Sequence, residues 1–337
     1  MDIDIILDAR ATAGELAELG RLAEEHGIRG VWVSSLLDSR DPFTNLSVLA
    51  TSSSRLQLGP VAVNPYDMHP VRIASAYLTL NELANGRARL VIGGGGEALE
   101  ALGIKPERRV RAVGECVEII KRSASGEPVN FSGELFRVKN LRLGWLEAPA
   151  PPVYVGASMP QMLRMAARTA DGTMMSDMPP SVAAQALRQL DQGLEAVGKS
   201  RPAFATSAFA AWHIYPDREQ AIREARQWLV LRGIFRPWLL SNFLEDDEVE
   251  LVMSRRDAFW QAFFSGSHMV EGVPDAVLNT LVEHITLAGS VNELDAKVEK
   301  LKAYESAGLS AVSLRLYHDP AESIRLIGKR VIPALKP

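Results

Sequence analysis

The stretch G-R-A-R-L-V-I-G-G-G-G-E-A-L-E-A-L-G-I, residues 86–104, indicates how the rest of the chain is organised. Its apolar run Leu90–Ile92 is typical of a short strand that is buried on both faces. Four consecutive glycines, 93–96, follow the run, and Glu97 comes next. Glycines add no side chain to a core, so this concentration predicts a sharp turn or the close approach of a flat or anionic group. Glu97 would stand at the carboxyl end of a buried strand, where α/β proteins place their chemistry.

Two other interpretations of the glycine run stay open at this point. Residues 93–98 fit the spacing G-x-G-x-x-A of a dinucleotide-binding turn, which requires a long helix and an acid about 20 residues further on. Gly103 and Pro106 interrupt the helical pattern, and Glu115 falls inside an amphipathic segment rather than at a strand end. The second interpretation is a glycine-rich turn without any ligand.

Strand-like runs alternate with helix-like runs along the whole chain. Eight strands, each followed by a helix, over 337 residues predict an α/β protein with the (β/α)₈ TIM barrel fold. A doubly wound open sheet is the alternative that the sequence does not exclude. The predicted strands are residues 3–7, 30–33, 56–63, 87–92, 152–155, 172–175, 204–214 and 311–316.

Two segments break the alternation, within what we predict to be a single domain over residues 1–337. Residues 124–150 contain period-2 patches and turn signals, which predict a small β-hairpin insertion. Residues 235–288 read as a long helical excursion before the last strand. The aromatic residues of this excursion have spacings that favour a role in the core or a subunit interface.

Composition excludes several classes of protein. Hydrophobic residues make up 47% of the chain and charged residues 23%, as in ordinary globular proteins with a large core. A net charge of −4 gives no electrostatic reason to expect nucleic acid or an anionic membrane as a partner. Cys116 is the only cysteine, and no histidines and acids have the spacing of metal ligands, so no disulfide or metal is predicted. The absence of a long apolar run predicts no membrane span and a cytoplasmic location.

Five segments resemble the luciferase-like monooxygenase superfamily, and within it the deazaflavin (coenzyme F420)-dependent oxidoreductases. L-G-P-V-A-V-N-P-Y-D-M-H-P (58–70) and T-L-N-E-L-A-N-G-R-A-R-L (79–90) resemble methylenetetrahydromethanopterin reductase. G-G-E-A-L-E (95–100) is similar to a loop of deazaflavin-dependent glucose-6-phosphate dehydrogenases. P-P-V-Y-V-G-A-S-M-P-Q-M-L (151–163) and T-A-D-G-T-M-M-S (169–176) resemble a strand-to-helix turn of the superfamily.

The resemblance implies a cofactor and a reaction. The cofactor would be coenzyme F420, with FMN as the alternative, and hydride would pass between its ring and a small organic substrate. An FMN-dependent monooxygenase of the same superfamily is the alternative function. Most relatives are dimers, so the resemblance also implies a homodimer.

The resemblance also assigns residues on the third predicted strand. It implies a non-proline cis peptide bond at Val61–Ala62, behind the deazaflavin ring, with Asn64 at the edge of the same pocket. Read without the family, Asn64 and Pro65 form an ordinary turn dipeptide, and this alternative stays open.

Further cofactor contacts are implied at two loops. Gly94 and Gly95 belong to the dehydrogenase-like loop, in which Glu97 would lie near the reacting carbon and move a proton. Residues 156–159 (Gly156, Ala157, Ser158 and Met159) precede a helix and would hold a phosphate of the cofactor tail. Without the family, Ser158 reads as a plain N-cap, and Glu97 as an exposed acid in the first turn of a helix.

The chain departs from the family at the end of the second predicted strand. Related members usually have an Asp-His pair there, whereas this chain has Ser35 and Leu36. Ser35 would still hydrogen-bond the ring, but leucine cannot act as a base. The departure argues against sugar-dehydrogenase activity, and it motivates a different hypothesis: a protein that binds the cofactor without turning over a substrate.

Overall fold

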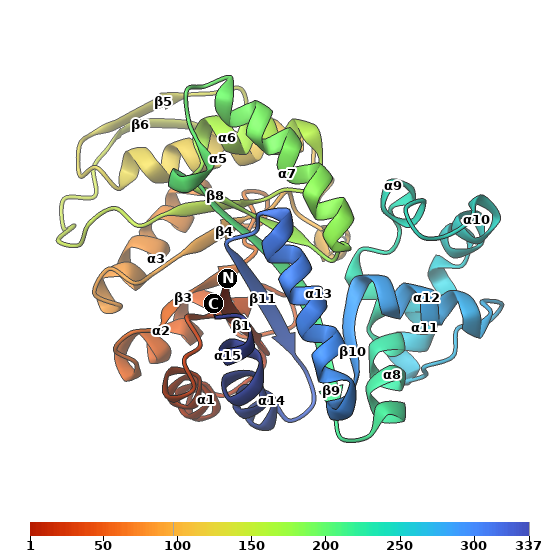
Figure 1. Cartoon of the computed structure of the whole chain (residues 1–337). Coiled ribbons are helices and arrows are strands. Elements are labelled where there is room, and N and C mark those ends of the chain that lie inside the picture. The colour runs from red at the N-terminus through yellow and green to blue at the C-terminus, as the bar shows by residue number, and fades with distance from the viewer. Residues whose placement is uncertain (97, 337) are drawn as a thin grey trace.

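Parallel strands close into a barrel in the computed structural model, which describes residues 1–96 and 98–336 (Figure 1). Neighbouring strands follow the order β3-β2-β1-β11-β9-β8-β7-β4. Bridges between Leu58 and Ala88 and between Val63 and Ile92 join the first and last of them. The barrel prediction is therefore confirmed, and the open sheet is wrong. The barrel strands are β1 (Asp2–Leu7), β2 (Gly30–Ser34), β3 (Gln57–Val61), β4 (Leu90–Ile92), β7 (Val153–Gly156), β8 (Gly172–Ser176), β9 (Ala205–Tyr215) and β11 (Ala311–Leu316).

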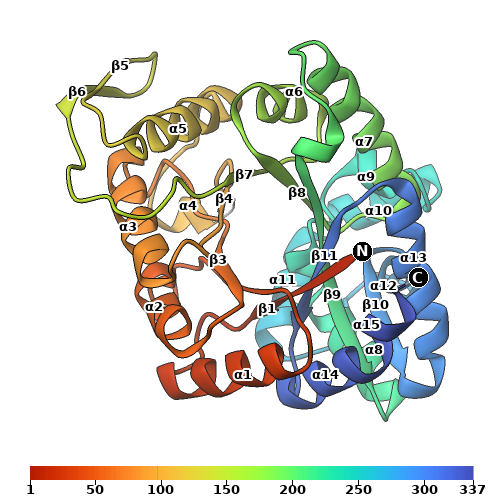
Figure 2. The same cartoon turned by 60° about the vertical axis from the view of Figure 1, so that its left-hand side comes forward.

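Helices surround the barrel and cover its outer face (Figure 2). Buried apolar residues of these helices belong to the large core cluster between helices and strands. The first of them begins at a capping box between Thr12 and Glu15, and its buried side consists of Leu16, Gly20 and Ala23. The surrounding helices are α1 (Ala13–Glu25), α2 (Pro42–Ser52), α3 (Pro70–Leu83), α5 (Arg109–Ser123), α6 (Pro160–Thr169), α7 (Pro180–Glu195), α13 (Leu294–Ala307) and α14 (Pro320–Leu326).

The barrel interior has its own small apolar cluster, separate from the layer between strands and helices. Ile6, Trp32, Val61, Val91 and Met174 form it, one from each of five strands. Because side chains alternate along a strand, the residues two positions further along point to the same interior, nearer the carboxyl ends of the strands. This cluster thus closes the barrel below its carboxyl end and leaves that end for polar groups.

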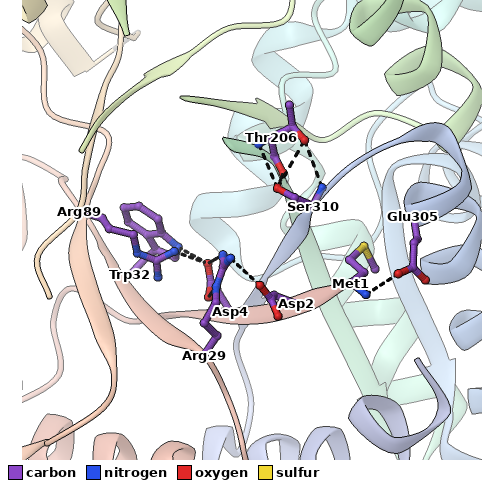
Figure 3. Close-up of polar contacts among 9 residues, drawn as sticks. All are labelled: Met1, Asp2, Asp4, Arg29, Trp32, Arg89, Thr206, Glu305 and Ser310. Atoms are coloured by element: carbon purple, nitrogen blue, oxygen red, sulfur yellow. Dashed lines mark hydrogen bonds and ion pairs between the residues drawn. The ribbon is translucent and has the colours of Figure 1, made fainter. Parts of the chain in front are cut away.

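A buried ion cluster lies at the opposite, amino-terminal end of the barrel (Figure 3). Asp4 is fully buried and accepts hydrogen bonds from Arg29 Nη2 at 2.7 Å, Arg89 Nη1 at 3.0 Å and Trp32 Nε1 at 3.1 Å. Burial opposes ionisation of this carboxyl, but the two arginines outweigh it and hold the pKa of Asp4 well below its usual range. The cluster joins β1, the start of β2 and the start of β4, so it stabilises the barrel rather than a ligand.

The same end of the barrel is tied by backbone and hydroxyl groups between β9 and the start of β11. Ser310 Oγ donates to the Thr206 carbonyl at 2.6 Å, and Ser310 N donates to Thr206 Oγ1 at 3.1 Å. The terminal amine of Met1 pairs with Glu305 nearby.

The predicted insertion at 124–150 contains an antiparallel hairpin of β5 (Val129–Ser132) and β6 (Arg137–Leu141). The buried carboxylate of Glu115, on α5, accepts backbone hydrogen bonds of 2.8–3.0 Å from residues 134–136 at the hairpin turn. Glu115 therefore anchors the hairpin. The glycine run is followed by the helix α4 (Ala98–Ala101), which has only four residues. Glu115 lies inside α5 and not at a strand end, so the dinucleotide interpretation is wrong.

The helical excursion occupies residues 216–285, so it begins earlier than the predicted residue 235. It leaves the end of β9, and the strand that follows it pairs with β9. The prediction of helix through 288 is wrong at its end, because Thr286–Ser290 forms strand β10, which pairs in parallel with Ala211–Tyr215 of β9. Phe259 is buried in the excursion's core, whereas Phe264 is 77% exposed. The elements between the two strands are α8 (Arg218–Gln227), η2 (Leu229–Arg232), α9 (Pro237–Leu240), α10 (Asp246–Ser254), α11 (Arg256–Ser265) and α12 (Asp275–Ile285).

Within the described part of the chain, no helix combines the length and the apolar character that crossing a membrane requires.

Candidate functional site

The cis peptide bond lies where it was predicted, between Val61 and Ala62 at the carboxyl end of β3. The Val61 carbonyl of this bond accepts a hydrogen bond of 3.0 Å from the backbone of Ser35, which follows β2. Next to it, Gly93 donates to the Val63 carbonyl at 2.8 Å. A Cβ atom on Gly93 would lie 3.1 Å from the Cβ of Ala62, closer than an ordinary contact. Only glycine therefore fits beside Ala62 without displacing it.

A second glycine extends this surface to β7. A Cβ atom on Gly156 would lie 3.7 Å from the Ile92 carbonyl and 3.8 Å from Gly93 Cα. At Gly93 and Gly156 the ends of β4 and β7 therefore present backbone in place of side chains, next to Ala62 at the end of β3. We call the surface of Ala62, Gly93 and Gly156 the glycine wall. A wall of this kind suits the face of a flat ring system.

The loop after β4 turns away from the glycine wall toward two helices. Gly95 has a φ of +71°, which glycine adopts without strain. A Cβ atom on Gly94 would lie 3.5 Å from Arg109 Cδ and 3.7 Å from Met162 Cε. Side-chain carbons of the exposed Arg109, at the start of α5, and of Met162, in α6, thus both lie beside Gly94. The sequence analysis did not single out Arg109.

The start of α6 offers backbone donors. Its N-cap is Met159, and no side chain caps the helix, so the interpretation of Ser158 as the N-cap is wrong. The Ala157 amide donates to the Met174 carbonyl at 3.1 Å, but within residues 1–96 and 98–336 the amides of Ser158 and Met159 donate no hydrogen bond. Free amides, the positive end of the helix dipole and the charge of Arg109 together suit an anion.

The side chain of Asn64 forms hydrogen bonds within the turn that follows it. Its Oδ1 accepts from the amides of Tyr66 at 3.0 Å and Asp67 at 3.3 Å, and its Nδ2 donates to Asp67 Oδ2 at 2.7 Å. The turn interpretation accounts for these contacts, and a contact between Asn64 and a cofactor stays a prediction.

The predicted catalytic acid, Glu97, lies outside the described residues. The structure does place Ser35 and Leu36, the residues at which the chain departs from the family. Ser35 is half-buried beside the cis bond, and the Leu36 side chain is 42% exposed. Neither residue supplies a charged group at this point of the barrel mouth.

Charged and aromatic residues gather on the other side of the mouth, at the ends of β8, β9 and β11. Asp177 is buried, has a φ of +43°, and accepts a hydrogen bond of 2.7 Å from Ser176 Oγ. Burial raises the pKa of Asp177, although Arg232 opposes the shift. A buried carboxyl in the left-handed region at a strand end is a frequent mark of a functional site.

His213 and Tyr317 stack beside this carboxyl, with ring centres 4.3 Å apart. The Nδ1 of His213 lies 2.7 Å from Glu224 Oε2. Burial lowers the pKa of His213, which favours the neutral form of its ring. Arg315 packs against Tyr317 from β11. Arg315 is a charged residue inside the apolar run 311–316, a signal that the sequence analysis did not use. The sequence around Arg232 contains no comparable signal.

Pocket volume does not locate the site. The most voluminous pocket described, about 650 Å³, lies between α2 and α3 and is lined by Asp67 and Arg72 among others. A pocket of about 420 Å³ lies at the ends of β1 and β11 and includes Asp8 and Tyr317. In the described ranges, no three His, Cys, Asp or Glu side chains are grouped as metal ligands. The converging strand ends therefore define the candidate site better than any single cavity.

Comparison with known proteins agrees with this geometry. The sequence pattern of the family described as luciferase-like monooxygenase matches residues 2–311. The chain is 33% identical to the 5,10-methylenetetrahydromethanopterin reductase of Archaeoglobus fulgidus over 96% of both chains. It is 28% identical to the F420-dependent glucose-6-phosphate dehydrogenase of Nakamurella multipartita, over 96% of this chain and 92% of that one.

A solved structure shares the fold over the full length. The coenzyme F420-dependent tetrahydromethanopterin reductase from Methanopyrus kandleri superposes with a TM-score of 0.84 at 22% identity, over 99% of both chains. At that identity the likeness shows the fold alone, whereas the sequence match is decisive for ancestry. The chain belongs to the luciferase-like monooxygenase family.

Proposed function

We propose that this protein is a coenzyme F420-dependent oxidoreductase that acts on a small organic substrate. The observation that carries the proposal is the glycine wall, a backbone surface without large side chains at the carboxyl ends of the barrel strands. Relatives whose names include F420 favour the deazaflavin over FMN, which is the alternative. When bound, the deazaflavin donates or accepts the hydride.

The chain's own groups account for binding and orientation. The glycine wall would hold the ring face, and the Ser35 amide fixes the Val61 carbonyl behind it. The uncapped start of α6, with the amides of Ser158 and Met159, would hold the anionic tail together with Arg109. Because Gly94 and Gly95 have no side chains, they would leave room for the cofactor tail between this loop and α6. The residues present thus fit a flat ring that carries a negatively charged side chain.

Titration of the purified protein with coenzyme F420 tests the proposal. We expect saturable binding with a low-micromolar or lower Kd, measured by quenching of the cofactor's fluorescence, and much weaker binding of FMN. Tight binding of FMN with none of coenzyme F420 would instead identify a flavin-dependent monooxygenase.

The Ser35–Leu36 departure supports a second candidate, a cofactor-binding protein without turnover. Reduced coenzyme F420 bound to the protein should be oxidised by at least one member of a panel of enones, imines and quinones if the protein is an enzyme. A bound cofactor that stays reduced with every compound, at the rate without protein, would favour the second candidate.

We further propose a cytoplasmic homodimer, in keeping with the resemblance described above. Sedimentation equilibrium should give a species of two chains, and a monomer at micromolar concentration would contradict this proposal. We propose no nucleic acid and no membrane as a partner, because the net charge of −4 gives no electrostatic attraction to either.

A further inference from the structure

Two arginines flank one phenol across the barrel mouth from the glycine wall. In the strand order, β9 and β11 face β3 and β4 across the barrel. Arg315 comes from β11, with its Cζ 5.2 Å from the centre of the Tyr317 ring. Arg232 comes from the excursion, with its Cζ 6.0 Å from the same ring and 4.8 Å from the ring of Phe209 in the barrel interior. A ligand between the two sides would touch the wall and this cluster together.

Both arginines are buried but incompletely paired. Each is 6% exposed, and burying a guanidinium is costly unless anionic partners are close. Arg232 Nη1 lies 3.4 Å from Asp177 Oδ1, and Arg315 Nη2 lies 3.6 Å from Asp8 Oδ2. Arg315 Nη1 also donates a hydrogen bond of 3.4 Å to the Ile6 carbonyl. Charge-assisted hydrogen bonds are usually about 2.7–2.9 Å long.

The ion cluster at the other end of the barrel provides an internal comparison. There, Asp4 Oδ2 accepts hydrogen bonds from Arg29 Nη2 at 2.7 Å and from Arg89 Nη1 at 3.0 Å. The same fold thus makes short buried ion pairs where their role is structural, even though, among the described residues, Arg89 Nε and Nη2 are buried there without a hydrogen bond. The long pairs at the mouth leave donor capacity that a ligand can use.

Specific donors in the cluster have no partner. Within residues 1–96 and 98–336, Arg232 Nε and the Tyr317 hydroxyl are buried without a hydrogen bond, although buried polar atoms are normally satisfied. Among nearby charges, Arg232 and Arg315 have the largest effect on the pKa of Tyr317, which burial raises and the two guanidinium groups lower. The hydroxyl therefore lies within the field of both cations. Buried donors without partners, close to two guanidinium groups, suit an oxyanion, which accepts several hydrogen bonds at once.

We propose that Arg232, Arg315 and Tyr317 form a subsite for an oxyanion of the substrate, a carboxylate or a phosphate group. The assignment to the substrate rests on the proposed function, which places the cofactor ring at the glycine wall. Held by its oxyanion on the β9–β11 side, a substrate would present the rest of its skeleton toward that wall. The chemical class that follows is a small organic acid or phosphate ester.

Calorimetric titration of the protein without added cofactor tests the subsite with two probes, inorganic phosphate and acetate, at constant ionic strength in a buffer free of both. We expect saturable binding of at least one probe. Phosphate alone would indicate phosphate esters as substrates, and acetate alone would indicate carboxylic acids. Arg232→Gln and Arg315→Gln should each weaken binding by about 10-fold or more, the usual scale for a charge-assisted hydrogen bond. Tyr317→Phe should weaken it by a smaller factor.

Controls separate the subsite from general electrostatics and from misfolding. Arg223→Gln removes the same charge from the surface of α8, where the side chain is 47% exposed, and should leave probe binding unchanged. Arg232→Lys keeps the charge in the buried position but loses the planar fork, so it should bind the probes with intermediate affinity. Thermal unfolding of each variant shows that the loss of binding occurs in folded protein.

The outcomes distinguish this inference from the proposed function. Equal probe affinity in all folded variants, or no probe binding by the unmodified protein, overturns the subsite even if coenzyme F420 binds. Competition between coenzyme F420 and the probes, with a parallel loss of cofactor affinity in Arg232→Gln and Arg315→Gln, also overturns it, because the cluster would then hold the cofactor tail. Probe binding that depends on the three residues, in a protein that does not bind coenzyme F420, supports the subsite and overturns the proposed function.

Discussion

Replacing Asp4 with asparagine should lower the free energy of unfolding by about 3–5 kcal/mol, the usual cost of removing one partner from a buried ion pair. The variant leaves Arg89, which is 2% exposed, without its carboxylate partner, and an amide nitrogen can then face a guanidinium. The same change removes the carboxylate that Arg29 holds with two hydrogen bonds. Urea unfolding at neutral pH followed by circular dichroism measures the loss.

Asp2→Asn is the matched control. Asp2 pairs with the same Arg29 at 2.9 Å, but its side chain is 58% exposed, so its loss should cost about 1 kcal/mol or less. Equal losses in the two variants would show that burial of Asp4 adds nothing to the stability of the barrel.

The pH dependence gives a second test of the Asp4 cluster. Folding lowers the pKa of Asp4, so the ionised carboxylate contributes its full stability above the ordinary aspartate pKa of about 3.9. That contribution is lost as pH falls toward the lower pKa of the folded state. The stability gap between the unmodified protein and Asp4→Asn should therefore narrow below about pH 4. A gap that stays constant in acid would contradict the ion-pair explanation.

Replacing Glu97 with glutamine should lower turnover by about 10²-fold or more, the usual scale for losing a positioned acid or base. We propose Glu97 as the group that moves the proton accompanying hydride transfer, from its place in the sequence and the family resemblance. The amide keeps the size and most hydrogen bonds of the carboxyl group, so cofactor affinity should stay near that of the unmodified protein. Steady-state rates and a cofactor titration measure the two quantities separately.

The pH–rate profile should also lose the limb that belongs to this carboxyl group. Weaker cofactor binding with unchanged turnover of the bound fraction would make Glu97 a cofactor contact only. The proton would then come from water, the substrate or a described group at the mouth. Among these groups, Asp177 resembles Glu97 most in its chemistry, because it is a buried carboxyl group whose pKa is raised by burial. No change in either quantity would leave Glu97 without a role in the reaction.

The barrel could be predicted because its signals are local. Most barrel strands are short and largely apolar, and the run 90–92 was recognisable from three residues followed by four glycines. Strand β10 escaped prediction because the sequence T-L-A-G-S is short, contains glycine and continues a helical pattern. Its strand conformation depends on pairing with β9, 75 residues earlier in register (Thr286 with Ala211), which no local pattern reveals.

The candidate site divides in the same way. The cis bond at Val61–Ala62 was predicted because the surrounding segment resembles a known family, and the structure confirms its position. The capping role of Ser158 was wrong by one residue, a normal error for a helix start. Arg232 could not be predicted, because its position depends on a fold of the excursion that brings it back over Phe209. Arg315 was accessible to prediction, since a charge in a buried strand needs a partner or a function.

The return of the excursion to β9 separates substrate choice from barrel stability. Residues 216–285 begin at the end of β9, and the strand that follows them, β10, pairs with β9 again. β9 pairs with β8 and β11 through other residues of the chain, so we expect the length and sequence of 216–285 to be variable without a change in that pairing. The exchangeable segment nevertheless delivers Arg232 to the mouth. We therefore expect replacement of residues 228–274, which leaves α8, α12 and the barrel in place, to change substrate specificity. Chimaeras joined at Gln227 and Asp275 would be a practical route to engineering it.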